Sequence, residues 1–184
     1  MGTQARTQRQ QVSQGGRRGV LLVDDEPHVT KGLALMLRSE PYRVWTAHSA
    51  DEALIALSAE SVDILVTDEK MPGMSGSCLL AEVRRLHPSV VSLMLSGEAT
   101  LDSAIRAINE GEVYRFFKKP VDRMELVAGI QSAIFVHDMI CEIRRLRREN
   151  ESKDRILRDL EARHPGITSL SVGDDGALIL DGLV

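Results

Sequence analysis

The chain of 184 residues lacks most features that mark secreted, membrane-spanning or broadly nucleic-acid-binding proteins. Its two cysteines, Cys78 and Cys141, lie far apart in helical patterns, which favours reduced thiols over a disulfide. No stretch approaches the roughly 20 apolar residues of a membrane span. The net charge of −4 offers no general attraction to nucleic acid or anionic membrane, and none of the five histidines has metal-ligand spacing. These absences together indicate a cytoplasmic protein.

The first 18 residues also lack an apolar stretch, and they are rich in glutamine and arginine. Such a segment is neither a signal peptide nor part of a core, so residues 1–18 are predicted to form a disordered basic arm. The remaining length is enough for one domain with a substantial core and an appendage.

Two apolar runs end in acidic residues. Val20 to Val23 is followed by Asp24 and Asp25, and the run from Val62 to Thr67 is followed by Asp68. A strand that is apolar almost throughout is typical of a buried parallel sheet, and open α/β sheets bind ligands at the carboxyl edge of such strands. Carboxylates gathered there predict a binding site for a hard cation with oxygen ligands. Among such cations, Mg²⁺ suits phosphate chemistry best.

Two further apolar runs bring other groups to the same edge. Val90 to Leu95 is followed by Ser96, and Val113 to Phe117 by Lys118 and Lys119. Each run lies about one strand and one helix beyond the last, so the sequence predicts an α/β fold with a doubly wound five-stranded parallel sheet. The other elements expected from periodicity and caps are helices at Pro27–Arg38, Ser49–Glu60, Ser77–His87 and Thr100–Glu110 and a strand at Arg43–Ala47.

These residues, taken together, resemble a response-regulator receiver domain of the chemotaxis-regulator type. The resemblance rests on Asp24-Asp25, on Asp68 in V-T-D-E-K-M-P-G-M-S-G, on Ser96 in M-L-S-G-E-A and on Lys119 in F-F-K-K-P. It covers residues 19–133, and no element of the family's pattern is missing. It implies a flavodoxin-like sheet with strand order 2-1-3-4-5 and a role in a two-component or phosphorelay system.

The resemblance also implies a phosphoacceptor site. Asp68 is expected to be the nucleophile that takes a phosphoryl group from a phosphohistidine on a sensor histidine kinase or phosphotransfer protein. Asp25, Asp68 and the backbone carbonyl of Lys70 are expected to ligate Mg²⁺, or Mn²⁺ in its place, with Asp24 acting mainly through water. Lys70 and Glu98 flank the expected path of an attacking water, so an ion pair between them is predicted to slow dephosphorylation.

Other positions are expected to sense the phosphoryl group. Lys119 is predicted to pair with a phosphate oxygen, or with the acceptor carboxylate when no phosphate is present, and Ser96 to donate its hydroxyl. In the family a ring on the last strand then turns inward, and by position this ring is Phe116, with Tyr114 on the same strand face. Pro120 is expected to follow a cis peptide bond, as it does in the family.

The last helix of the receiver is predicted to continue well beyond it. Asp122 and Glu125 form a capping box, and no helix breaker follows until residue 164, so residues 134–164 are predicted to be an extended helix. A parallel homodimeric coiled coil is expected because Asn150 on the seam favours that register, although Lys153 weakens it and a single docked helix is the alternative. The predicted seam positions are Val136, Met139, Ile143, Leu146, Asn150, Lys153, Leu157 and Leu160.

The basic run from Arg144 to Arg148 raises the question of nucleic-acid binding. Acidic residues interleave with these arginines, as the flanks of a coiled coil require, and this pattern argues against a nucleic-acid partner. Residues 165–184 then contain two short apolar stretches around Gly173-Asp174-Asp175-Gly176, which predict a β-hairpin tail. A lone hairpin is marginal in water, so it is expected to need a partner.

The sequence therefore predicts a cytoplasmic, phosphorylation-controlled regulator whose output is contact with an unidentified downstream protein through the extended helix. No enzymatic activity is expected beyond self-phosphorylation from a phosphodonor and autodephosphorylation at Asp68. Two alternatives stay open. The chain could be the receiver portion of a cyclic-di-GMP phosphodiesterase-type regulator without its output domain, or a phosphorelay intermediate that passes its phosphate onward.

Overall fold

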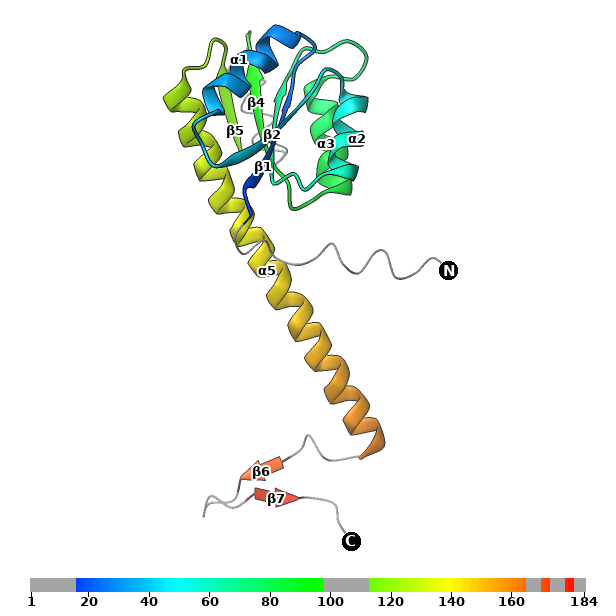
Figure 1. The fold of residues 1–184 in the computed structure, drawn as a ribbon. Helices are drawn as coiled ribbons and strands as arrows, with labels where there is room; N and C mark the ends of the chain where they lie inside the picture. Colours follow the sequence, from blue (N-terminus) through cyan, green and yellow to red (C-terminus); the bar gives the residue numbers. More distant parts are fainter. Residues whose placement is uncertain (1–15, 98–112, 165–169, 173–177, 181–184) are drawn as a thin grey trace. The chain divides into compact units, whose positions relative to one another are not determined.

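The computed structural model of the chain describes residues 16–97, 113–164, 170–172 and 178–180 (Figure 1). The predicted helix Thr100–Glu110, residues 1–15 of the predicted arm and the predicted hairpin turn lie outside the described residues. In chain order the elements are β1 (Arg18–Val23), α1 (Pro27–Leu37), β2 (Tyr42–Ala47), α2 (Ala50–Ala59), β3 (Ile64–Asp68), α3 (Gly76–Leu86), β4 (Val91–Ser96), β5 (Arg115–Lys118), α5 (Arg123–Arg163), β6 (Leu170–Val172) and β7 (Leu178–Leu180).

Five strands form one parallel sheet in the order β2-β1-β3-β4-β5, which confirms the predicted architecture and strand order. Every residue of β3 and β4 is buried, as their continuous apolar runs predict. The prediction for the last strand was wrong at its start, because the ladder with β4 begins at Arg115 rather than Val113 and extends to Lys118. The aligned strands end at one edge of the sheet, where the predicted acids, serine and lysine lie.

Helices cover both faces of the sheet. Helices α2 and α3 lie side by side on one face, and α1 lies with the first turns of α5 on the other (Figure 1). Because side chains alternate along a strand, Leu21 and Val23 of β1 point to the α2 and α3 side. The core on that side also contains Leu57 of α2, Leu65 of β3, Leu79, Leu80 and Val83 of α3 and Met94 of β4.

The predicted helix caps are present. The Ser49 hydroxyl accepts a hydrogen bond from the Glu52 backbone N–H at 3.2 Å, and Asp122 accepts one from Glu125 at 3.0 Å. The Glu52 carboxylate accepts from the backbone N–H of His48, one residue before the cap, at 2.7 Å. Helices α2 and α5 therefore begin where short-range sequence signals place their first turns.

Helix α5 is 41 residues long and ends at Arg163, so the predicted extension of the last receiver helix is confirmed as a helix. The chain divides into two compact units, residues 1–138 and 139–184, with the boundary inside α5. In the first unit, α5 presents Leu126, Gly129, Ile130, Ala133 and His137 as its buried residues. In the second unit, β6 and β7 pair antiparallel, with Leu170 opposite Leu180, which confirms the predicted hairpin.

Among the described residues, only α5 has an 18-residue stretch long and apolar enough to cross a membrane. Its apolar residues before position 138 include the buried positions that cover one face of the sheet. Only 28% of that stretch is buried, so packing in the core of the first unit accounts for part of its apolar character.

A ring of polar contacts joins α5 to the amino-terminal ends of β1 and β3. The Arg18 guanidinium lies 2.8 Å from Asp138, and the buried His137 ring lies 3.4 Å from carboxylate oxygens of both Asp138 and Asp63. Asp63 in turn accepts the backbone N–H of Gly19 at 2.9 Å. The ring closes on β1, so it fixes α5 against the sheet by polar contacts as well as by apolar packing.

Candidate functional site

The predicted site residues lie together at the carboxyl edge of the sheet. Asp24 follows β1, Asp68 ends β3, Ser96 ends β4 and Lys119 follows β5. Asp24 is fully buried, and Asp68 and Ser96 are only 6% and 4% exposed. Buried carboxylates are costly unless a cation or hydrogen-bond donors compensate them, so the partners of the two acids determine what the site can do.

Lys119 supplies the compensating charge. Its ammonium nitrogen lies 2.6 Å from Oδ2 of Asp24 and 2.6 Å from Oδ1 of Asp68. Burial lowers the pKa of Lys119, but the hydrogen bonds and charges of the two carboxylates outweigh burial and hold its pKa above the ordinary value. Pairing with Asp68 agrees with the sequence-based expectation, whereas the equally short contact with Asp24 was not predicted. Lys118, the adjacent lysine, is exposed.

Backbone groups hold the remaining oxygens of the acids. The N–H of Lys70 donates to Oδ2 of Asp68 at 2.9 Å, and the N–H of Glu26 donates to Oδ1 of Asp24 at 3.0 Å. The Thr67 hydroxyl donates to the backbone carbonyl of Asp68 at 3.0 Å. Both carboxylates are therefore oriented before any ligand binds, which is the preorganisation that a reactive site requires.

The loop after Asp68 is braced by a pair that sequence reasoning missed. The Glu69 carboxylate accepts the hydroxyl of Ser77 at 2.7 Å and its backbone N–H at 3.0 Å, so it caps the first turn of α3. Gly76 is required beside this brace, because a Cβ there would lie 2.1 Å from the backbone oxygen of Asp68. An acidic residue eight positions before a serine is no recognised local signal, which explains the omission.

The donor chemistry of the site fits a hard divalent cation. Carboxylates of Asp24, Asp25 and Asp68, together with a backbone carbonyl at Lys70, are the oxygen ligands that Mg²⁺ prefers. Asp25 is half-buried and thus remains reachable from solvent. Within the described residues no three acidic, histidine or cysteine side chains are grouped closely enough to hold a metal ion, and Lys119 pairs with both buried acids. A cation here would therefore have to share the carboxylates with this ammonium.

The candidate switch residues occupy different environments. Phe116 is half-buried and packs against the core under α2 and α3, whereas Tyr114 is 43% exposed and precedes β5. Phe117, the next residue, is buried to 1% exposure and contacts α5 at Gly129, because neighbouring strand residues face opposite sides of the sheet. Glu98, the expected partner of Lys70, lies outside the described residues. The peptide bond before Pro120 is cis, as expected.

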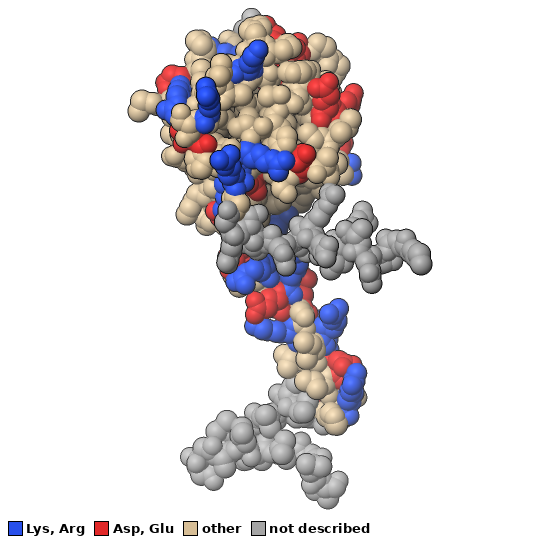
Figure 2. All heavy atoms as spheres, in the orientation of Figure 1, with Lys and Arg blue, Asp and Glu red and all other residues tan. Residues whose placement is uncertain are grey.

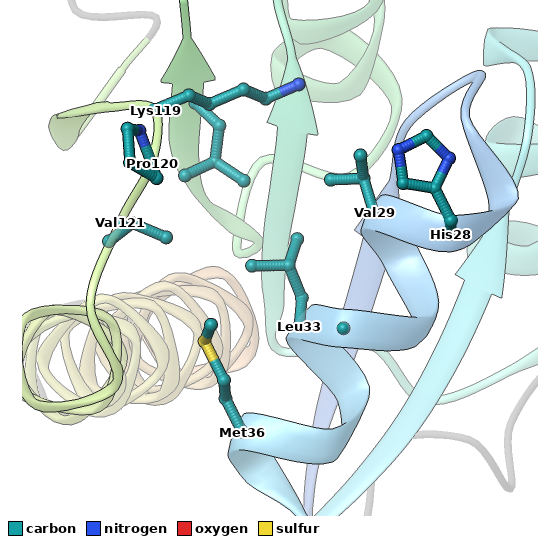
Figure 3. A pocket seen from close by; sticks show the side chains of 9 residues that line it. His28, Val29, Leu33, Met36, Lys119, Pro120 and Val121 are labelled. Atoms are coloured by element: carbon teal, nitrogen blue, oxygen red, sulfur yellow. The ribbon is translucent and has the colours of Figure 1, made fainter.

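An apolar pocket of about 420 Å³ adjoins the site between α1 and the loop after β5. Figure 3 shows the Lys119 side chain extending along its rim above Leu33 and Val29. The complete lining is His28, Val29, Gly32, Leu33, Met36, Leu95, Lys119, Pro120 and Val121. The same lysine that pairs with the buried acids thus also borders this hollow.

The sequence pattern of the response regulator receiver domain matches residues 20–131. The chain is 38% identical over 115 residues to the transcriptional regulatory protein GlrR of Escherichia coli, covering 62% of the chain and 26% of GlrR. It is 30% identical over 163 residues to the nitrogen assimilation regulatory protein NtrX of Azorhizobium caulinodans, covering 88% of the chain and 36% of NtrX. The chain thus spans about a quarter to a third of these relatives.

Solved structures show the same fold. The structure described as adenylate cyclase from Rhodopirellula baltica is 32% identical with a TM-score of 0.68, and the match covers 72% of this chain and 98% of that one. The signal receiver domain of an HD domain-containing protein from Pseudomonas fluorescens is 33% identical with a TM-score of 0.64, covering 67% and 98%. These similarities cover the sheet and its helices.

Proposed function

Because the chain belongs to the response regulator receiver domain family, we propose that it accepts a phosphoryl group on Asp68 from a histidine kinase or phosphotransfer protein. The observation that carries this proposal is the position of Asp68, buried at the carboxyl edge with one oxygen on Lys119 and the other on the Lys70 N–H. Receiver domains in general bind Mg²⁺ at this place, and the oxygen donors present here fit that ion.

The chemistry follows from the oriented carboxylate. An oxygen of Asp68 attacks phosphorus, the O–P bond forms, and the N–P bond of the donor phosphohistidine breaks with its electron pair returning to the imidazole. Bound Mg²⁺ would neutralise charge on the transferred group, held by Asp25, Asp68 and the Lys70 carbonyl, with Asp24 acting mainly through water. Lys119 pairs with a phosphoryl oxygen, for which its ammonium has a third N–H donor beyond the two directed at Asp24 and Asp68.

Phosphorylation is proposed to alter the loop after β4 and the ring on β5. Ser96 lies at the end of β4, where its hydroxyl can donate to a new acceptor oxygen and draw its loop inward. Phe116, half-buried beside this edge, then fills the space released, with Tyr114 as the second aromatic candidate. Loss of the phosphoryl group by hydrolysis restores the Asp68 carboxylate.

The lifetime of the aspartyl phosphate is proposed to depend on Lys70 and Glu98, which the family resemblance implies on either side of the path of an attacking water. Small residues at both positions are expected to speed dephosphorylation several-fold, as measured by loss of the phosphoryl mass over time. Unchanged decay in the double variant Lys70→Ala/Glu98→Ala would remove this role from the proposal.

The output is proposed to be protein contact through α5, with a second copy of this chain as the first partner and an unidentified downstream protein as the target. Exposed apolar side chains beyond residue 138 support this, because a solvated helix does not need them at a regular spacing. No enzymatic output is proposed beyond phosphorylation and dephosphorylation of Asp68, and the site of action is proposed to be the cytoplasm.

A second candidate is that the chain is the receiver part of a larger regulator. The match to a receiver from an HD domain-containing protein and the partial coverage of GlrR and NtrX favour this candidate. A cyclic-di-GMP phosphodiesterase would be one such whole protein. The phosphorelay alternative differs in that a phosphotransfer protein should remove the phosphoryl group from Asp68 faster than water does.

The proposal is tested by incubating the chain with acetyl phosphate and Mg²⁺ and recording intact mass. One added phosphoryl group is expected on the wild type, none after chelation of the metal, and none on Asp68→Ala. Asp51→Ala, which removes an acid from the first turn of α2, is the matched control and should be phosphorylated normally. Phosphorylation of Asp68→Ala at the wild-type rate would overturn the assignment.

A further inference from the structure

Beyond residue 138, α5 carries an apolar stripe that its own unit leaves exposed. Ile143, Leu146, Leu157 and Leu160 are between 39% and 50% exposed. Together with positions 150 and 153, they are spaced by steps of three and four residues on one face of the helix, which is the a and d pattern of a coiled coil. The proposed homodimer would cover this face. Which way the two helices run can be argued from the charges that flank the stripe.

The middle of the stripe is polar. Asn150 and Lys153 occupy its two central positions, and the Lys153 ammonium lies 2.9 Å from the Glu149 carboxylate on the same helix. That hydrogen bond lowers the pKa of Glu149, which keeps it charged. Figure 2 shows basic and acidic side chains interleaved along the helix on the face in view. The partner helix must therefore accommodate charge both in the centre of the seam and along its edges.

A parallel pairing gives these charges poor partners. Every seam residue then faces its own copy, so Lys153 lies opposite Lys153 of the partner subunit. Along the edges, Glu142 faces Arg147 of the partner subunit, which is favourable, but Glu149 faces Asp154 of the partner subunit, which is repulsive. The attractive edge pairs are offset by an equal number of repulsive ones, and two ammonium groups meet in the seam.

An antiparallel pairing removes both conflicts. Pairing position 143 with 160, 146 with 157 and 150 with 153 keeps the four apolar residues in contact with one another. Lys153 now meets Asn150 of the partner subunit instead of a second ammonium. The edge pairs become Glu142 with the partner's Arg163 and Arg147 with the partner's Asp154, both attractive, while Glu149 faces an isoleucine.

We propose that α5 forms an antiparallel homodimer centred between Asn150 and Lys153. The inference rests on the proposed homodimer and gives the direction in which its two helices run. Asn150 paired with itself favours a parallel register, and Met139 adds an apolar contact only in that register. The charge pattern opposes these two preferences for the parallel register, because that register places like charges at the centre and the edges of the seam.

Paired cysteines test the direction. In the full chain with Cys78→Ser and Cys141→Ser, Leu146→Cys and Leu157→Cys variants are mixed under mild oxidation. The expected product is the mixed disulfide between 146 and 157, because only the antiparallel register brings these positions together. Disulfides of each variant with itself would overturn the proposal in favour of a parallel pair. Circular dichroism verifies that both variants keep their helix.

A charge reversal gives an independent readout by analytical ultracentrifugation. Asp154→Lys faces Arg147 of the partner subunit in the antiparallel register and should weaken dimerisation roughly tenfold, since both symmetric pairs change from attraction to repulsion. In the parallel register the same change faces Glu149 and should tighten the dimer, which would contradict the proposal. Glu151→Lys makes the same change of charge outside the seam and should leave the dissociation constant within about twofold.

Failure of the dimer and failure of the phosphoacceptor are separable. If the wild type is a monomer at all concentrations, with and without beryllofluoride, the antiparallel pair and the homodimer are both overturned. The acetyl phosphate experiment on Asp68 is unaffected by that result, because it depends only on the site at the carboxyl edge.

Discussion

The Lys119 ammonium and the Asp24 carboxylate, 95 residues apart in the chain, form a 2.6 Å ion pair in which Asp24 is wholly buried. The same nitrogen is equally close to Asp68. A single lysine thus bridges two acids that would otherwise repel each other and offsets one of their two negative charges. Any cation that binds the acids competes with this lysine, so metal binding and the position of Lys119 are linked.

Removing the lysine should therefore favour the metal. Lys119→Met is expected to raise the affinity for Mg²⁺ about tenfold, because the cation no longer shares Asp24 and Asp68 with an ammonium. Titration calorimetry measures the affinity directly. Lys118→Met removes the adjacent exposed lysine and serves as the control. Equal Mg²⁺ affinity in wild type and Lys119→Met would show that the ion binds without displacing Lys119.

The raised pKa of Lys119 predicts how stability depends on alkaline pH. The folded chain holds this proton more tightly than the unfolded chain, so the stabilisation is fully present below the ordinary lysine pKa of about 10.4 and is lost as pH rises through the higher folded value. Urea unfolding between pH 8 and 11 should show the free energy of unfolding falling as pH rises. In Lys119→Met this fall should be smaller.

Tyr42 requires a control in that experiment. Burial and the charge of Glu40 raise the pKa of Tyr42, so its neutral form is also favoured in the folded chain and its contribution declines over the same alkaline range. Comparing the Tyr42→Phe chain with the Tyr42→Phe/Lys119→Met chain isolates the contribution of Lys119 to the pH dependence of stability. A pH dependence that is identical in both chains of that pair would contradict the role given to Lys119.

Helix α5 and strand β5 are in such close contact at Gly129 that replacing this glycine by any other residue should destabilise the fold. An added Cβ would lie 2.2 Å from the Phe117 ring, so Gly129→Ala is expected to lower the free energy of unfolding by about 1–3 kcal/mol. Gly32→Ala in α1, where the Cβ meets nothing within 4 Å, should be neutral or stabilising by up to about 1 kcal/mol. Phe117→Leu should recover part of the loss in the Gly129→Ala chain, and additive losses would argue against this contact as the cause.

The polar ring at the opposite edge predicts a graded response to substitution. His137→Ala should cost about 1–3 kcal/mol, because it removes one of the two polar partners of Asp63 and opens space beside the sheet. Arg18→Ala and Asp138→Ala should show a coupling energy below about 1 kcal/mol in a double-mutant cycle, since both side chains are partly exposed. A coupling energy between Arg18 and Asp138 larger than the loss from His137→Ala would contradict the prediction that His137 contributes more to stability.

Much of the fold was predictable because its signals are local. Uninterrupted apolar runs define β1, β3 and β4, and serine, aspartate and proline mark helix starts within one turn. Strand order and the cis bond before Pro120 came from the family resemblance rather than from periodicity. The start of β5 was missed because Val113 and Tyr114 continue the apolar pattern, although the ladder with β4 begins at Arg115, two residues after Val113.

What the sequence determined by itself is which groups reach the carboxyl edge, since a strand ending in Asp68 or Ser96 delivers its side chain there in any parallel sheet. Tertiary structure alone decided the partners. That Lys119 bridges two acids and that His137 closes a ring with Asp63 depends on distances between segments far apart in the chain. Periodicity and capping act over a few residues, so they carry no information about such distances.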